Sequence, residues 1–267
     1  FNPRMGISYV DGAHNAFLSA AIAHREPTRS DFTDRYMFAA DQTEPKPERL
    51  YDYELGYQFK MPNLALGANF YYMRYKDQLI PTGMVNDSSD ALNVNVPLSY
   101  RAGVELTAMW SVARWLTLGG NATFSRNKII DYVDLLADSP TYGENLGDMT
   151  IAYSPETVAS AFAEFKFKQF EAVLNAQHVG KQYFTNNEIE ALTLDAYCVT
   201  NLDLAYTLRT KAAKSVRLGV SIYNLLNSKY CSNGYGYSYM WDGERYDEAY
   251  YFPQAPLHFL ANVTIKF

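Results

Sequence analysis

Apolar side chains at every second position are the feature that most constrains how this chain can fold. In residues 100–111, Val104 and Leu106 lie on one side of the alternation, whereas Glu105 and Thr107 lie on the other. A helix repeats about every 3.6 residues and would mix these two sets on each of its faces. The pattern therefore predicts β-strands that each have one apolar and one polar face.

The same alternation recurs along the whole chain. It predicts about eleven strands, each long enough to cross a membrane at a tilt. They fall near residues 5–10, 15–24, 51–59, 64–72, 100–111, 116–125, 157–167, 170–179, 201–209, 216–222 and 257–267. The last of them, from Leu257 to Phe267, alternates up to a terminal aromatic residue, which is typical of the final strand of an outer-membrane barrel.

The composition fits a membrane barrel better than a soluble protein. Tyr is unusually frequent, with 23 residues among 267, and yet the mean hydropathy is only −0.26. Alternating strands keep the mean hydropathy low, and Tyr and Phe collect in the two interfacial girdles of such barrels. The net charge of −6 argues against nucleic-acid binding, which requires an excess of Lys and Arg. No stretch approaches the roughly 18 apolar residues of a transmembrane helix.

The lengths of the connections predict the orientation of the barrel. Short links alternate with long ones along the chain. The short links are Asp11–Asn15, Met61–Asn63, Val112–Trp115, Lys168–Gln169 and Lys211–Lys214, and the long ones are Arg25–Leu50, Lys76–Leu98, Asn127–Pro155, Gly180–Tyr197 and Asn227–Pro256. Outer-membrane barrels have short periplasmic turns and long extracellular loops. We therefore expect a Gram-negative outer-membrane protein with its long loops outside the cell and its C-terminus in the periplasm.

An odd number of strands does not close a barrel of the usual bacterial kind. An unpaired strand edge in lipid would leave backbone groups without hydrogen bonds, at a cost of several kcal/mol each. We therefore expect the strand that ends at Phe267 to pair with sequence outside this chain. The sequence also shows no signal peptide, as expected of a processed or partial chain.

Several stretches together resemble the C-terminal half of the barrel of TonB-dependent outer-membrane receptors. The two most specific are Lys46–Leu50, which leads into Tyr53–Tyr57, and Tyr223–Tyr230. The other stretches are Arg25–Phe32, Tyr71–Leu79, Ser99–Leu106 and the terminal Phe267. The similarity covers essentially the whole chain.

The resemblance implies an all-β fold, a transmembrane antiparallel barrel of about 22 strands that is filled by a plug. Residues 1–267 would be the C-terminal part of one barrel domain, without the plug and the N-terminal strands. Such receptors are not enzymes. They bind a scarce nutrient, such as a ferric siderophore, haem or cobalamin, and import it with energy supplied through TonB.

The partners that the resemblance implies are outer-membrane lipid, the remaining strands and the plug in the same or a companion chain, TonB acting through the plug, and a small-molecule metal chelate. A passive porin is the alternative, and an adhesin or enzyme anchored by the barrel is a third class. A plug with a TonB-binding stretch in the upstream sequence would favour transport, whereas strands alone would favour a porin.

The long connection Asn227–Pro256 supplies the candidate ligand contacts. Tyr235, Tyr237, Tyr239 and Trp241 could stack on a planar ligand while their polar groups form hydrogen bonds with it. Alternatively, these rings pack the loop against itself and its neighbours.

Charged residues at the rim and inside the barrel have two interpretations. Arg25 and Arg29 could contact an anionic ligand, but ion pairs with the plug on the lumen side are favoured, because charges inside a barrel need partners. The same interpretation applies to the polar-face residues Arg101, Glu105, Asp203, Arg209 and Arg217.

Cys198 and Cys231 are predicted to form a disulfide. Folding the chain at the Lys211–Lys214 link brings both residues to the same end of adjacent strands, and a disulfide needs Cα atoms about 4.4–6.8 Å apart. One connection is acidic and could hold Ca²⁺, but its spacing matches no ligand loop, so a solvated loop is favoured and no metal site is expected. Its acidic residues are Asp131, Asp134, Asp138, Glu144 and Asp148.

Overall fold

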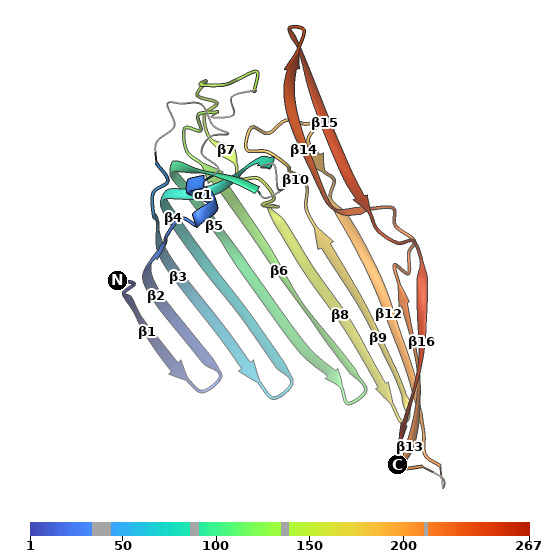
Figure 1. The fold of residues 1–267 in the computed structure, drawn as a ribbon. Helices are drawn as coiled ribbons and strands as arrows, with labels where there is room; N and C mark the ends of the chain where they lie inside the picture. The colour runs from blue at the N-terminus through green and yellow to red at the C-terminus, as the bar shows by residue number, and fades with distance from the viewer. Residues whose placement is uncertain (34–43, 86–90, 135–138, 211–212) are drawn as a thin grey trace.

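A computed structural model describes residues 1–33, 44–85, 91–134, 139–210 and 213–267. Within these residues, eleven strands lie side by side in chain order in one antiparallel sheet (Figure 1). They are β1 (Arg4–Asp11), β2 (His14–Arg25), β3 (Glu48–Met61), β4 (Leu64–Val85), β5 (Ala91–Ala113), β6 (Leu116–Ile129), β8 (Thr157–Phe167), β9 (Phe170–Val179), β12 (Tyr197–Leu208), β13 (Ser215–Tyr223) and β16 (His258–Lys266). The prediction of an all-β antiparallel wall is confirmed.

The remaining elements lie at one end of the sheet, which we call the mouth; the opposite end is the short-turn end (Figure 1). They are α1 (Arg29–Thr33), β7 (Met149–Thr150), β10 (Gln182–Tyr183), β11 (Thr193–Leu194), β14 (Cys231–Trp241) and β15 (Glu244–Pro253). β7 pairs with β6, whereas β10–β11 and β14–β15 form two separate hairpins. Among the described residues, no helix is long and apolar enough to span a membrane.

Tight turns and matched registers explain why the strands align. Gly12 turns β1 into β2 with a φ of 55°, a left-handed conformation that glycine adopts without strain. Val104 lies opposite Phe70 on one side and Phe124 on the other. Because successive side chains point to opposite faces, this pairing places the apolar residues of all three strands on one face. The predicted link Lys211–Lys214 lies partly outside the described residues.

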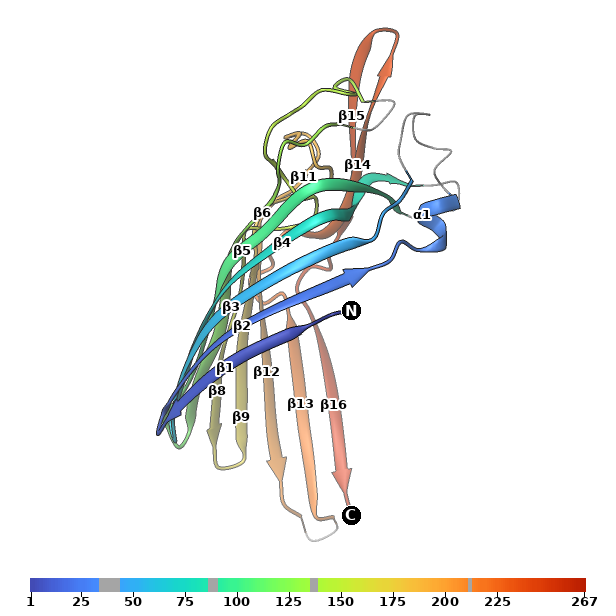
Figure 2. The same cartoon turned by 90° about the vertical axis from the view of Figure 1, so that its left-hand side faces the viewer.

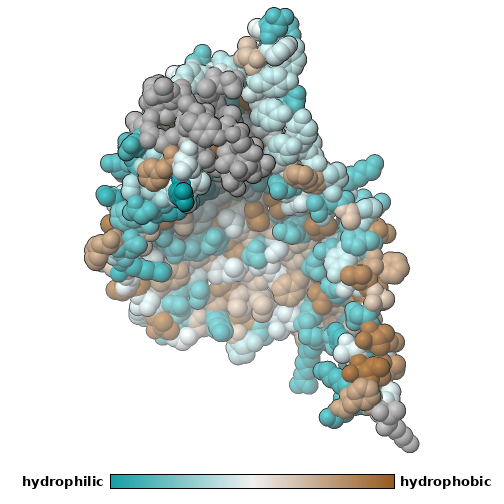
Figure 3. All heavy atoms as spheres, viewed as in Figure 1, coloured by the Kyte–Doolittle hydropathy of each residue, from teal (hydrophilic) through white to brown (hydrophobic). Residues whose placement is uncertain are grey.

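The sheet has an apolar outward face and a polar inward face. Figures 1 and 2 show that it curves around a concave side, and Figure 3 looks into that side, where hydrophilic residues are spread over the wall. The alternate positions carry large hydrophobic side chains that nothing covers. Examples are Leu55, Phe70, Leu106, Leu218 and Val263. A barrel turns such a face toward the membrane.

Two of the predicted loops contain long strand segments, besides the two-residue strands β7, β10 and β11 in two others. β4 and β5 continue to Val85 and from Ala91, well past the expected limits. The connection Asn227–Pro256 folds into the β14–β15 hairpin. Its sequence signal is alternation on both sides of Asp242-Gly243, a pair that favours a two-residue turn; both residues have positive φ, 51° and 78°.

Candidate functional site

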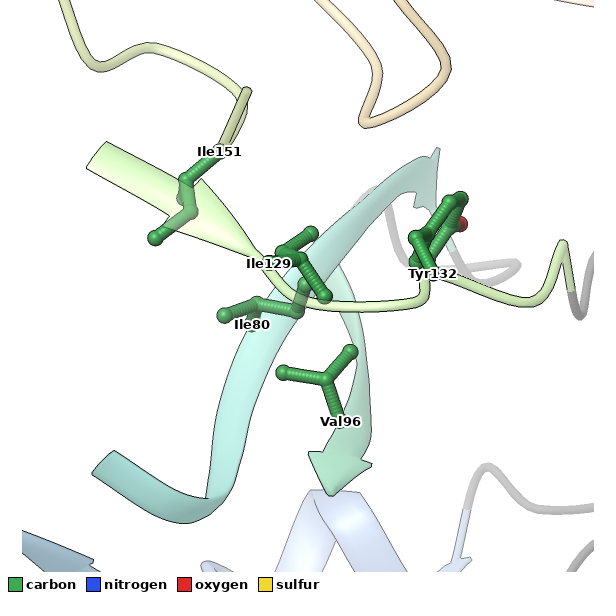
Figure 4. Packing of buried hydrophobic residues seen from close by; sticks show 5 residues of the cluster. All are labelled: Ile80, Val96, Ile129, Tyr132 and Ile151. Carbon is green, nitrogen blue, oxygen red and sulfur yellow. The ribbon is translucent and has the colours of Figure 1, made fainter. Parts of the chain in front are cut away.

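The mouth has a small hydrophobic core of its own. Ile80, Val96, Ile129, Tyr132 and Ile151 pack together and are almost completely buried (Figure 4). They come from β4, β5, β6 and the segments around β7. Burial raises the pKa of the Tyr132 hydroxyl. This core fixes the segments at the mouth, so that side chains attached to them are held in defined positions.

Polar side chains tie residues 181–194 to this core. Glu188 forms an ion pair with Lys128 at 2.8 Å and accepts a hydrogen bond from the Thr150 amide at 2.7 Å. Burial alone would raise the pKa of the Glu188 carboxyl, but these hydrogen bonds hold it below its usual value. Asn186 adds a second tie. Its side-chain amide donates a hydrogen bond to the Pro81 carbonyl of β4 and accepts one from the Ala152 amide just after β7, each at 2.8 Å.

The β14–β15 hairpin packs on residues 181–194 through two glycines. A Cβ atom at Gly236 would lie 2.9 Å from Leu192 Cδ2 and 3.0 Å from Phe184 Cδ2. A Cβ atom at Gly234 would lie 2.8 Å from Phe184 Cζ. The Tyr251 hydroxyl adds a hydrogen bond to a β11 carbonyl at 3.0 Å. The two glycines leave the space that the Phe184 and Leu192 side chains fill, and the hairpin is therefore docked.

The other face of the hairpin carries a ladder of stacked tyrosines. The rings of Tyr235 and Tyr250 lie 5.0 Å apart at 12°, and those of Tyr239 and Tyr246 lie 5.5 Å apart at 17°. The Glu248 carboxylate accepts hydrogen bonds from the Tyr250 hydroxyl at 2.6 Å and the Tyr239 hydroxyl at 2.8 Å. The hydrogen bond to the Glu248 carboxylate raises the pKa of the Tyr250 hydroxyl. One carboxylate thus fixes the hydroxyls of two neighbouring tyrosines on this face.

The four aromatic residues predicted as ligand contacts share this face. Tyr235, Tyr237, Tyr239 and Trp241 alternate along β14, and Trp241 at the tip is 71% exposed. The rings pack partly against each other, but much of their surface is open. Glu248, which was not predicted as a site residue, also accepts a hydrogen bond from the Tyr237 hydroxyl at 3.1 Å. Only the register of the hairpin places this carboxylate opposite Tyr237.

A cleft of about 460 Å³ lies at the base of the hairpin. Tyr197, Tyr230 and Tyr251 line it together with the charged residues Asp195 and Lys229. The rings of Tyr197 and Tyr230 stack at 4.8 Å. The volume is within the range of small-molecule sites. The cleft could not be predicted from the sequence, because its walls come from two connections that meet only in the folded chain.

The two predicted rim arginines lie at the end of β2 and the start of α1, and Figures 1 and 2 show both elements apart from the β14–β15 hairpin. Arg25 pairs with Glu48 at 3.0 Å and donates a hydrogen bond to the Leu79 carbonyl at 2.8 Å. These contacts give Arg25 a structural role at the rim. Arg29 begins α1 and is exposed, and no ion pair within the described residues involves it.

The predicted disulfide between Cys198 and Cys231 is not formed, and both thiols are free. Cys231 lines the cleft together with Tyr197, the residue before Cys198. Side chains alternate along β12, and Cys198 accordingly lines a groove on the outward face instead. The register therefore puts the two sulfur atoms on different surfaces.

Charged residues on the inward face find partners within the wall. Arg217 pairs with Glu171 on a nearby strand at 2.8 Å. Arg101 donates a hydrogen bond to the Ser154 hydroxyl at 3.1 Å. Asp203 accepts a hydrogen bond from a serine of the neighbouring strand. These partners all lie within the wall, and the predicted contacts with a plug stay a prediction.

Three acceptors on the inward face of β2, β3 and β4 have no donor. They are the side-chain oxygens Asn15 Oδ1, Asp52 Oδ1 and Asn69 Oδ1, which are closed off from solvent and receive no hydrogen bond from the described chain. Leaving a buried acceptor unsatisfied costs about 1–3 kcal/mol. The wall itself carries this cost, because these oxygens are covered by their own neighbours in the sheet.

The acidic connection is anchored by one buried carboxylate. Asp134 is completely buried and accepts hydrogen bonds from Ser139 and, at 2.6 Å, from Thr141. For this residue the prediction of a solvated loop is wrong, because local hydroxyl donors satisfy its charge. Asp138 lies outside the described residues. Among those described, no group of three or more His, Cys, Asp and Glu side chains could hold a metal ion.

Solved structures with the same fold span the whole of this chain. The ferric yersiniabactin uptake receptor FyuA from Yersinia pestis has a TM-score of 0.67 at 18% identity, covering 100% of this chain and 37% of its own. The copper transporter OprC has a TM-score of 0.69 at 16% identity, covering 99% and 39%. The ferric-catecholate import receptor Fiu from E. coli K12 has a TM-score of 0.67 at 16% identity, covering 99% and 34%. The chain thus spans less than half the length of these proteins.

No curated protein sequence matches the chain. Residues 1–225 match the family described as TonB dependent receptor-like, beta-barrel. This match covers most of the eleven-stranded wall, and it agrees with the outward apolar face and with the resemblance carried by the sequence. The chain therefore belongs to the β-barrel family of TonB-dependent receptors, whose members lie in the outer membrane of Gram-negative bacteria.

Proposed function

We propose that this chain forms the wall and part of the outer binding surface of a TonB-dependent transporter that imports a small metal chelate. The observation that carries the proposal is the ordered, exposed aromatic face of the β14–β15 hairpin at the mouth. Similar structures include uptake receptors for ferric yersiniabactin and for ferric catecholates, and a copper transporter. The chemistry proposed is binding and translocation, without a covalent step.

The tyrosine ladder suits a chelate that has planar groups and hydrogen-bonding atoms. Aromatic rings gain about 0.5–1.5 kcal/mol from a stacking partner beyond the area that they bury. The ladder is already ordered by Glu248 and by the docking of the hairpin on Phe184, so little side-chain freedom remains to be lost on binding. We assign the first contact with the substrate to Tyr235, Tyr237 and Tyr239.

We further propose that a plug fills the concave side and that the complete barrel has about 22 strands. The polar concave face supports this, because side chains such as Asp52, Glu105 and Arg217 have to meet polar groups or water and not lipid. TonB would then act through the plug. In this arrangement the mouth faces the outside of the cell, and the C-terminus lies in the periplasm.

Uptake of radiolabelled metal chelates by cells that express the full-length receptor tests the proposal. Replacing Tyr237 and Tyr239 together with Ala should raise the chelate concentration needed for half-maximal uptake about tenfold, since each lost stacking contact costs about 0.5–1.5 kcal/mol. The matched control is Tyr206→Ala, which removes an exposed ring from the outward face of the wall.

The maximal rate should change little, because the variant alters binding and leaves the plug and TonB intact. An unchanged half-maximal concentration for every imported chelate would refute the assignment of the ladder. Uptake that continues at the same rate in cells without TonB would identify a passive channel instead.

A further inference from the structure

The face of the β14–β15 hairpin that carries the stacked tyrosines is negatively charged. We call it the ladder face; every second residue of the two strands contributes to it. Its carboxylates are those of Glu244 and Glu248, and no Lys or Arg is among its residues. Arg245 lies on the other face of β15, where it pairs with Asp247 at 2.8 Å. The ladder face therefore favours a cation over an anionic group.

Three phenol hydroxyls converge on the Glu248 carboxylate. Tyr237 and Tyr250 both donate to Oε2, at 3.1 and 2.6 Å, and Tyr239 donates to Oε1 at 2.8 Å. The register produces this convergence, because Tyr237 lies directly opposite Glu248 and the other two tyrosines are the next residues of the same face. The Tyr237 ring lies 6.2 Å from each of their rings. Four oxygen-bearing side chains thus meet at one place.

The spacing around Glu248 Oε2 is that of neighbouring ligands on a small metal ion. An octahedral ion that binds oxygen atoms at about 2.0 Å holds neighbouring ligand atoms about 2.8 Å apart. The Tyr250 and Tyr237 hydroxyl oxygens lie 2.6 and 3.1 Å from Oε2, on either side of that value. An ion that replaces the two hydroxyl protons therefore needs little movement of either phenol oxygen relative to the carboxylate. Both rings are exposed, so the ion reaches the site from water.

The charge of this ligand set matches a trivalent ion. Once both phenols are deprotonated, Tyr237, Tyr250 and Glu248 supply three negative charges, which neutralise an ion of charge 3+. A phenol ordinarily loses its proton only near pH 10, so an ion that binds it at neutral pH must polarise it strongly. Oxygen ligands select hard ions, whereas soft ions prefer thiolates, and a tyrosine oxygen holds iron in some haem proteins. Fe(III) meets all of these requirements.

We propose that the ladder face binds Fe(III) directly, through the Tyr237 and Tyr250 phenolates and the Glu248 carboxylate. Each phenol releases its proton to water as its Fe–O bond forms. Bonds from the metal to water or to its carrier break in their place, and the iron stays trivalent throughout. The Tyr239 hydroxyl keeps its hydrogen bond to the other carboxylate oxygen, Oε1. The iron is cargo that the hairpin takes up, not a resident cofactor.

Direct coordination narrows the class of chelate that suits this hairpin. Three ligands from the hairpin occupy half of an octahedron, so the carrier must leave coordination positions open or give them up readily. A labile ferric complex meets this condition, whereas a hexadentate chelate encloses its ion and offers the hairpin no position on the metal. The inference rests on the proposed function, in which the ladder makes the first contact with the imported chelate, and it names the metal itself as the contacted atom.

Titration of the full-length receptor in detergent with ferric nitrilotriacetate tests this site. A phenolate bound to Fe(III) gives a visible charge-transfer absorption band, which reports the coordination itself. Y237F and Y250F each remove one ligand oxygen but keep the ring, and each should weaken binding at least about tenfold, since even groups that only support a metal ligand contribute that much. The double variant should lose the band. The matched control is Y246F, which removes a ladder hydroxyl that bonds Glu244 instead, at 3.3 Å, and should keep the band.

Retention of heat-modifiable mobility shows that each variant is folded. The proposal is overturned if the unaltered receptor gives no band, or if Y237F/Y250F binds Fe(III) as tightly as Y246F. Equal competition by Mg²⁺ or Ca²⁺ would overturn the assignment to a trivalent ion. Because the Phe variants keep the stacking rings, the two proposals can fail separately. Loss of chelate uptake in Y237A/Y239A without any iron band would reject direct coordination alone, whereas a band with unchanged uptake in Y237A/Y239A would reject the role of the ladder in transport alone.

Discussion

The docking of the β14–β15 hairpin depends on Phe184, and replacing this residue with Ala should release the hairpin without unfolding the wall. The ring is completely buried and fills the space left by Gly234 and Gly236. It also lies 5.9 Å from the Tyr153 ring and 5.8 Å from the Tyr251 ring. These contacts all lie in the mouth, outside the eleven-stranded sheet.

The size of the effect follows from the surroundings of the ring. Truncating a buried Phe to Ala costs about 3–5 kcal/mol. Phe184 meets the hairpin at Gly234, Gly236 and Tyr251, but it also packs on Tyr153 and Leu192 outside the hairpin, so only part of this cost falls on docking. Docking should therefore lose about 2 kcal/mol, which corresponds to opening about thirtyfold more often.

Hydrogen exchange in the full-length receptor measures this opening. A two-stranded hairpin is only marginally stable alone, so the amides of residues 231–253 should exchange faster once it is undocked. Those of β12 (Tyr197–Leu208) should be unchanged, and Leu226→Ala, at an exposed position nearby, is the matched control. Unchanged exchange in residues 231–253 would refute the role of Phe184. Equal acceleration in β12 would show that Phe184 supports the whole wall.

Three further outcomes are expected. The pKa of the Glu188 carboxyl is lowered in the folded state. At pH values above the ordinary pKa of Glu, the ionised carboxylate therefore stabilises residues 181–194. This stabilisation is lost as the pH falls through the lowered pKa. Proteolysis of that segment should therefore rise only in acid, and E188Q should remove the pH dependence; a parallel rise in E188Q would contradict it. Cys198 and Cys231 should both react with a maleimide in unfolded, unreduced protein, and two blocked thiols would contradict the free state. Gly56→Val should displace the Phe17 ring, whose nearest atoms lie 2.1 Å from a Cβ at that position, and lower the folded fraction seen by heat-modifiable mobility; an unchanged fraction would argue against this packing.

The fold of the wall could be predicted almost entirely from the sequence, because the information is local. Alternation of apolar and polar residues determines that a segment is a strand and which side of it faces lipid. Residues 157–167 and 170–179 were predicted with the bounds that the structure has. Chain order then determines the sheet order, since consecutive strands pair through tight turns.

The candidate site was predictable only in part. The sequence marks an aromatic group, in which Tyr235, Tyr237, Tyr239 and Trp241 alternate. The connection Asn227–Pro256 was predicted to be a loop, however, and the strand that carries this group was therefore not predicted. The role of Glu248 could not be predicted, because no spacing distinguishes one carboxylate in an acidic, tyrosine-rich stretch. The disulfide prediction was wrong because closeness of Cys198 and Cys231 along the fold does not determine the faces to which their side chains point.

The sequence by itself determined that this chain is a transmembrane β-wall with an apolar outward face and long connections at one end. The tertiary structure decided what those connections do. Phe184 meets Gly234 and Gly236 across a gap of about fifty residues, and Lys128 forms its ion pair with Glu188 across 60 residues. The alternation of apolar and polar residues is a property of neighbouring residues, whereas docking and ion pairing arise from contacts between distant segments, which only the folded chain defines.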